Sequence, residues 1–165
     1  MNITVITISI IIMFLVFGFL VFGMLFISPL TFISDYPPDI QAVYYRTQHK
    51  EAAKEKLTTL MRIKKAAALI IFMFVFAWML HIAGAQTFLQ GLLLAYGYIF
   101  CLFAWDTFFI DWILFANVKR IRLPGTEHMD KEYHQKWFHV RACIPMIPVF
   151  AAMGALSALI MLLIW

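Results

Sequence analysis

A group of acidic and histidine side chains in the second half of the chain could carry chemistry. Four are candidates for catalytic groups or metal ligands: Asp106, Asp111, Glu127 and His139. Carboxylates and imidazoles transfer protons, act as general acids and bases, and bind metals. An ionisable residue within an apolar membrane segment is expensive unless it is paired or functional. The sequence therefore predicts a carboxylate and histidine site near a membrane edge.

The spacing of these residues limits how they can combine. Asp106 and Asp111 are five residues apart, so on a regular α-helix they diverge by roughly 140°. They converge on one site only where a π-bulge intervenes. The spacing of His128, His134 and His139 matches poorly the i,i+3 or i,i+4 spacing of metal ligands on a helix. A metal site is therefore the weaker interpretation, and the sequence identifies no cofactor.

Each polar residue also has a structural interpretation. Asp106 could simply pair with Lys65. His81 and Gln90 are expected to hydrogen-bond across a helical hairpin. His139 enters an apolar segment near the expected depth of Asp106, so a His–Asp pair is the functional hypothesis to test first. A half-solvated histidine at the membrane interface is the alternative.

Glu127 follows a short stretch that is typical of a turn. Pro124 and Gly125 predict the turn, and Thr126 is expected to cap a helix that begins near Glu127. On this structural interpretation, Glu127 lies on a solvated helix face.

Four long apolar segments must position these residues: 3–32, 66–85, 87–117 and 141–165. About 20 apolar residues cross a hydrocarbon core, so each is long enough to span. Hydrophobic residues make up 64% of the chain and mean hydropathy is +0.86, which excludes an ordinary soluble domain. The sequence predicts an all-α integral membrane protein, with one domain over residues 1–165 and four transmembrane helices in a bundle. The first segment is too long for a signal peptide, and we expect it to be retained.

Basic residues indicate the orientation of the chain in the membrane. All 13 Lys and Arg lie between positions 46 and 65 or between positions 119 and 141. By the positive-inside rule, the connections 33–65 and 118–140 are cytoplasmic. The two termini and a short turn at 84–87 are then outside. The net charge of +4 fits anionic lipids on the cytoplasmic side, and no motif accompanies it that would indicate nucleic acid binding.

The second and third helices are expected to extend into the cytoplasm. No Pro or Gly occurs from Asp39 to Ala83, so one helix over residues 39–85 is predicted, with an amphipathic surface helix as the alternative. A symmetric hairpin about positions 85 and 86 puts Asp106 at the cytoplasmic membrane edge. The apolar run 108–115 beyond it must then pack on the first connection, on the fourth helix or in the head-group layer.

The fourth helix carries two further signals. Pro145 and Pro148 should kink it. Small residues then form a stripe that lets helices approach closely, either within the bundle or in a homo-oligomer: Ala151, Gly154, Ala155 and Ala158. The two cysteines, Cys101 and Cys143, have no metal or redox spacing and are expected to be buried free thiols.

These features leave three hypotheses for function. The first is a small membrane protein that binds or conducts an ion or small solute through the carboxylate and histidine site, as an oligomer. The second is a membrane enzyme that acts on lipid or isoprenoid head groups at the cytoplasmic interface. The third is a structural subunit of a larger membrane complex.

Overall fold

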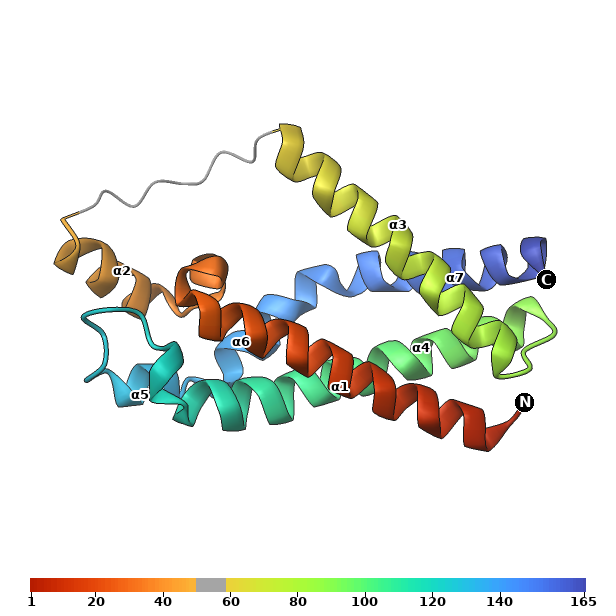
Figure 1. The fold of residues 1–165 in the computed structure, drawn as a ribbon, viewed down its shortest axis with the longest axis horizontal. Helices are drawn as coiled ribbons and strands as arrows, with labels where there is room; N and C mark the ends of the chain where they lie inside the picture. The colour runs from red at the N-terminus through yellow and green to blue at the C-terminus, as the bar shows by residue number, and fades with distance from the viewer. Residues whose placement is uncertain (50–58) are drawn as a thin grey trace. The chain divides into compact units, whose positions relative to one another are not determined.

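The computed structural model describes residues 1–49 and 59–165, apart from the side chains of Leu60, Met61 and Lys65. Within these ranges every regular element is helical (Figure 1). Four helical stretches are long and apolar enough to cross a membrane: Ile3–Ile27, Arg62–Ile82, Phe88–Phe115 and Lys136–Ile164. The predicted all-α class is therefore confirmed, as is the presence of four helices long and apolar enough to span a membrane.

Prolines follow the C-terminal end of the first span and interrupt the fourth. Helix α1 (Ile3–Ile27) ends before the predicted limit, because Pro29 opens a 3₁₀ segment, η1 (Pro29–Asp35). In the fourth span, the 3₁₀ turn η4 (Ile144–Met146) separates α6 (Lys136–Cys143) from α7 (Ile147–Ile164). The structure thus has a 3₁₀ turn at Pro145, where the two prolines were predicted to kink the helix.

The first connection does not continue as one helix. Helix α2 (Pro38–Thr47) ends at Thr47, and His49 has a positive φ of 50°. A left-handed residue cannot extend a right-handed helix. The predicted single helix over residues 39–85 is therefore wrong, and α3 (Thr59–Ile82) is a separate element. The prediction for residues 50–58 lies outside the described residues.

The chain forms two compact units, each assembled from segments distant in sequence. Unit 1 contains Met1–Met13, Glu55–Phe103 and Met146–Trp165. Unit 2 contains Phe14–Lys54 and Ala104–Pro145. All four predicted site residues belong to unit 2.

Unit 1 is held by close helix packing. Helix α3 packs against α7 (Figure 1), and α4 (Phe88–Ala104) approaches α7 through small residues. A Cβ at Gly154 would lie 2.6 Å from Tyr96 Cε1, and one at Gly91 would lie 3.2 Å from the Cβ of Ala158. Two members of the predicted small-residue stripe therefore serve packing within unit 1.

The polar pair predicted in unit 1 is not formed. The His81 ring stacks on Trp165, with 5.0 Å between ring centroids. The Gln90 side-chain carbonyl accepts a hydrogen bond from the Gln86 backbone N–H at 2.9 Å. In the described part of the chain, no hydrogen bond joins His81 to Gln90.

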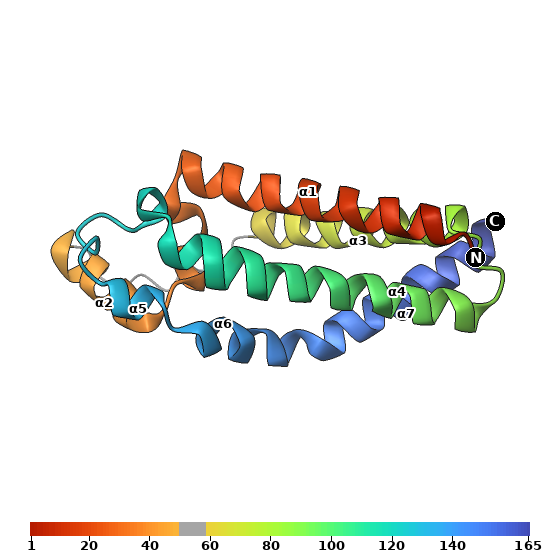
Figure 2. The same ribbon diagram turned by 90° about the horizontal axis from the view of Figure 1, so that it is seen from below.

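Part of the apolar run 108–115 packs against two of the partners predicted for it, while Phe108 and Ile113 are exposed. Phe115 packs edge-on against Tyr36 of the first connection, with 5.0 Å between centroids. Trp112 contacts Trp137 at the start of the fourth span, at 5.9 Å. Helix α5 (Asp130–Tyr133) lies beside α2 (Figure 2).

The connection between the third and fourth spans is a folded loop. Gly125 forms the predicted turn with a φ of 85°. Thr126 does not cap a helix, because its hydroxyl is buried between the Leu123 carbonyl and the Tyr133 hydroxyl, at 2.7 and 2.8 Å. Helix α5 begins instead at Asp130.

A buried arginine holds this loop together. Arg122 Nη1 donates to the Glu127 carbonyl at 2.6 Å, and Nη2 lies 2.5 Å from Asp130 Oδ1. Its guanidinium also lies over the Tyr133 ring, 4.7 Å from the centroid. The Arg122 charge lowers the pKa of the Asp130 carboxyl. Sequence reasoning predicts for Arg122 only its part in the orientation of the chain.

Candidate functional site

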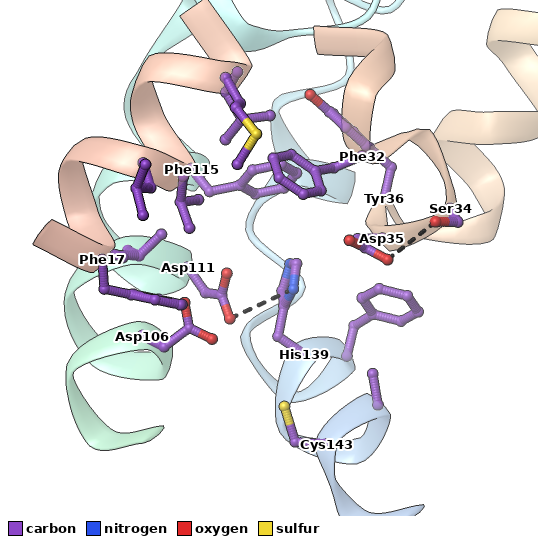
Figure 3. Close-up of a pocket in the computed structure, with 17 residues that line it drawn as sticks. Phe17, Phe32, Ser34, Asp35, Tyr36, Asp106, Asp111, Phe115, His139 and Cys143 are labelled. Atoms are coloured by element: carbon purple, nitrogen blue, oxygen red, sulfur yellow. Dashed lines mark hydrogen bonds and ion pairs between the residues drawn. The ribbon is translucent and has the colours of Figure 1, made fainter. Parts of the chain in front are cut away.

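A cavity of about 540 Å³ lies within unit 2 (Figure 3). Residues of α1, η1, the third span and α6 line it. Its polar lining includes three of the four predicted site residues, Asp106, Asp111 and His139. Most of the remaining lining is aromatic or aliphatic. The cavity therefore combines ionisable groups with apolar walls.

The two predicted aspartates reach the same cavity because the third span changes its helical form. Residues Trp105–Phe115 form a π-helical segment, η2. In a π-helix, hydrogen bonds join residues five apart, so side chains five apart lie on nearly the same face. Asp106 and Asp111 both point toward the cavity in Figure 3. The geometric condition that the sequence set for their convergence is thus met.

A histidine pairs with one of the aspartates. His139 Nδ1 lies 3.5 Å from Asp111 Oδ2, and each side chain is 14% exposed. The ring of His139 also packs edge-on against Phe115, with 5.1 Å between centroids. The pair joins α6 to η2 and involves Asp111, whereas the depth argument favoured Asp106.

Glu127 lies apart from the cavity. Its carboxylate accepts a hydrogen bond from the Gly125 backbone N–H at 3.0 Å. Backbone N–H donors lower the pKa of the Glu127 carboxyl. This exposed carboxylate serves the turn in the loop, and it does not lie on the predicted helix face, because α5 begins only at Asp130.

The side chain of Lys65, the structural partner predicted for Asp106, lies outside the described residues. Among described side chains, Asp106 has neither an ion pair nor a hydrogen bond. The Asp106–Lys65 pair stays a prediction.

The cavity also contains residues that sequence reasoning missed. Asp35 lines it from the end of η1, and the Ser34 hydroxyl donates to Asp35 Oδ1 at 3.1 Å. Tyr36 lines it too, while its hydroxyl donates to the Ile121 carbonyl at 2.6 Å. The available signal was an Asp between an apolar span and two prolines, a position that suggested only a connection.

The lining is electrostatically one-sided. Asp35, Asp106 and Asp111 contribute carboxylates, and the described lining residues include no Lys or Arg. Among the described residues, His, Cys, Asp and Glu form no group of three or more that could hold a metal ion. The arrangement can bind a cation, and the Asp111–His139 pair can accept or donate a proton.

Comparison of the chain with known protein families, with curated proteins and with solved structures found no match. The function must therefore be argued from the site.

Proposed function

We propose that this multi-pass membrane protein binds a small solute or ion in the unit 2 cavity. The observation that carries the proposal is the set of three carboxylates and one histidine around about 540 Å³ of space. Ligand sites in proteins are concave, mostly apolar and equipped with a few convergent polar groups. The cavity has each of these properties.

The free-energy cost of placing carboxylates in a membrane span supports a functional role for Asp106 and Asp111. Ionisable residues within membrane spans face a bundle interior or a cavity and mark binding sites and ion paths. Asp106 and Asp111 lie in the third span and line such a cavity. Only Asp111 has an ionisable partner among the described side chains. Packing alone would favour apolar residues at both positions.

The orientation remains part of the proposal. The basic connections 33–65 and 118–140 are cytoplasmic by the positive-inside rule, and both termini are outside. Asp35 and His139 line the cavity and lie within these connections. The cavity would then face the cytoplasmic side, with the ends of the second and third spans extending into the cytoplasm.

Cysteine labelling tests this orientation. In a background without native cysteines, Asn2→Cys and Gln86→Cys should react with a membrane-impermeant maleimide in intact cells. Lys131→Cys should react only after the cells are opened. Labelling of Lys131→Cys from outside would reverse the orientation.

The native thiol at the cavity tests solute access. Cys143 lines the cavity, and Cys101→Ser leaves it as the only cysteine. We expect N-ethylmaleimide to modify Cys143 in detergent. Ala142→Phe, which adds a ring at the lining, should slow the reaction at least severalfold. A Cys143 thiol that does not react in the folded protein, but reacts after denaturation, would overturn the proposed open binding cavity.

A double-mutant cycle separates function from structure at Asp106. If Asp106 only pairs with Lys65, Asp106→Asn should cost about 3–5 kcal/mol of stability, and adding Lys65→Met should recover most of it. The proposed binding role predicts instead a folded Asp106→Asn protein with weakened ligand binding, and no rescue by Lys65→Met. Thermal denaturation in detergent measures the stability arm.

A membrane enzyme acting on lipid or isoprenoid head groups is the second candidate. The Asp111–His139 pair favours it, because a carboxylate that orients an imidazole is a common acid–base arrangement. The purified protein would then release a head-group product from reconstituted lipids, detected by phosphorus NMR. His139→Gln should abolish the release, while Glu127→Gln should not.

A homo-oligomer and a role as a subunit of a larger complex also remain proposals. Gly154 and Ala158 already pack against α4 within unit 1, whereas Ala151 is exposed on α7. Mass measurement of the protein released in native nanodiscs tests both. A single chain without partners would exclude them.

A further inference from the structure

We propose that the ligand of the unit 2 cavity is an organic ammonium cation, with its charged nitrogen among the carboxylates and its carbon substituents against the aromatic walls. This inference rests on the proposed binding function and adds the chemical class of the ligand. It follows from the charge, the wall chemistry and the size of the cavity taken together.

The charges of the lining residues indicate that the ligand is positively charged. Carboxylates from two separate elements face the same space: Asp35 from η1, and Asp106 and Asp111 from η2. His139 partners Asp111 alone. Attraction between opposite charges is several times stronger near a protein interior than in water. A cationic ligand therefore supplies the positive charge that the described lining lacks, and an anionic ligand is repelled.

The walls favour an organic cation over a bare metal ion. Rings of Phe17, Phe32, Phe115 and Phe138 line the cavity with Tyr36, and several surround the carboxylates in Figure 3. Aromatic faces attract ammonium groups that come within about 6 Å, and cages of rings recognise quaternary ammonium. A metal ion needs several convergent oxygen or nitrogen ligands, which the described residues do not provide as a group.

The size also suits an organic molecule. A volume of about 540 Å³ falls within the range of roughly 300–1,000 Å³ for small-molecule sites. An ammonium group with carbon substituents can contact carboxylates on one side and rings on the other. The same chemistry could come from a free solute or from the choline head group of a lipid.

The first experiment compares choline with its uncharged isostere, 3,3-dimethylbutan-1-ol, in which carbon replaces the nitrogen. Binding is measured by saturation-transfer NMR to the protein in phosphatidylglycerol nanodiscs, which contain no choline. We expect saturable choline binding at least tenfold tighter than binding of the isostere. Equal binding of the two probes, or none of choline, would overturn the inference.

The same titration in phosphatidylcholine nanodiscs distinguishes the two sources. Choline affinity that weakens severalfold there assigns the lipid head group, because the bilayer then competes for the cavity. Unchanged affinity assigns a free solute. Both results support an ammonium ligand.

Variants link the binding to the cavity. Asp111→Asn and Asp106→Asn should each weaken choline binding by roughly tenfold or more, because a charge contact is lost. Phe17→Leu should weaken it roughly two- to fivefold through loss of a cation–π contact, and should leave the isostere unaffected. Glu127→Gln removes a carboxylate outside the cavity and is the matched control with unchanged binding. Equal effects of Asp111→Asn and Glu127→Gln would place the choline site elsewhere.

Failure of the ammonium ligand can be distinguished from failure of the proposed binding function. A reactive Cys143 thiol together with no choline preference overturns the ammonium ligand and leaves the binding cavity standing. An unreactive Cys143 thiol removes both.

Discussion

The two units of the chain differ in the kinds of side chain that they place in their interiors. In unit 1, packing of small residues against larger ones dominates, as where Gly154 meets the Tyr96 ring. In unit 2, charged groups lie inside the structure: a buried Arg122 in the loop, and Asp106 and Asp111 at the cavity.

This contrast extends to buried polar atoms without hydrogen-bond partners. Among described residues, unit 1 holds one such atom, the Tyr98 hydroxyl oxygen. Unit 2 holds Trp105 Nε1, Thr107 Oγ1 and Arg122 Nε. Such groups reduce stability. Within the described residues they are more frequent in unit 2 than in unit 1, and Trp105, Thr107 and Arg122 do not line the cavity.

The largest expected effect tests whether unit 2 depends on its buried charge. Arg122→Met removes donors to the Glu127 and Ala116 carbonyls and the pairing with Asp130. We expect a loss of about 2–4 kcal/mol, because hydrogen bonds from a charged group are lost and carbonyls are left unpaired. Unfolding in SDS mixed micelles measures the loss.

The control removes the other side of the same ion pair. Asp130→Asn changes a mostly exposed side chain and should cost much less than Arg122→Met. Equal costs would mean that the ion pair, rather than the carbonyl contacts, holds the loop.

A smaller effect tests whether unit 1 depends on close packing. Gly154→Ala puts a methyl group 2.6 Å from Tyr96 Cε1, and overpacking of this kind costs about 1–3 kcal/mol. Gly97→Ala is the matched control, because its Cβ would meet nothing within 4 Å. Gly97→Ala should be neutral or stabilising by up to about 1 kcal/mol. Indistinguishable unfolding of the two variants would contradict the packing of α4 on α7.

The next effect concerns the Asp111–His139 pair. We expect Asp111→Asn and His139→Gln to couple by about 1 kcal/mol in a double-mutant cycle, as for residues in direct contact. Glu127→Gln combined with His139→Gln should be additive, because Glu127 lies outside the cavity. Coupling in the control cycle as large as in the test cycle would show that the cycle reports general destabilisation.

Much of the fold followed from hydrophobic length, since each span needs a run of apolar residues whatever its neighbours. The predicted bounds of the second helix were wrong because the local backbone conformation ends α2 near His49. The positive φ of 50° at His49 has no strong signal in the sequence. The site was recoverable in part, because carboxylates in apolar segments stand out. Asp35 was missed because its role depends on a contact between segments distant in the chain. The π-helix was foreseen only as a condition, since no local sequence pattern in Trp105–Phe115 marks where the helix widens.

The smallest expected effect concerns pH and the loop of unit 2. Arg122 lowers the pKa of the Asp130 carboxyl below its ordinary value of 3.8, and backbone N–H donors lower that of Glu127 below 4.5. A carboxyl with a lower pKa in the folded state stabilises the fold above its unfolded pKa, and this stability is lost as pH falls through the folded pKa. The melting temperature in detergent should therefore drop by a few degrees below about pH 4. Asp130→Asn should reduce that drop, while Glu132→Gln, in the same short helix, should leave it unchanged. Because Asp130 is exposed, raising the salt concentration should also weaken the effect. A wild-type pH profile in Asp130→Asn would show that the Arg122–Asp130 pair does not contribute to the stability of unit 2.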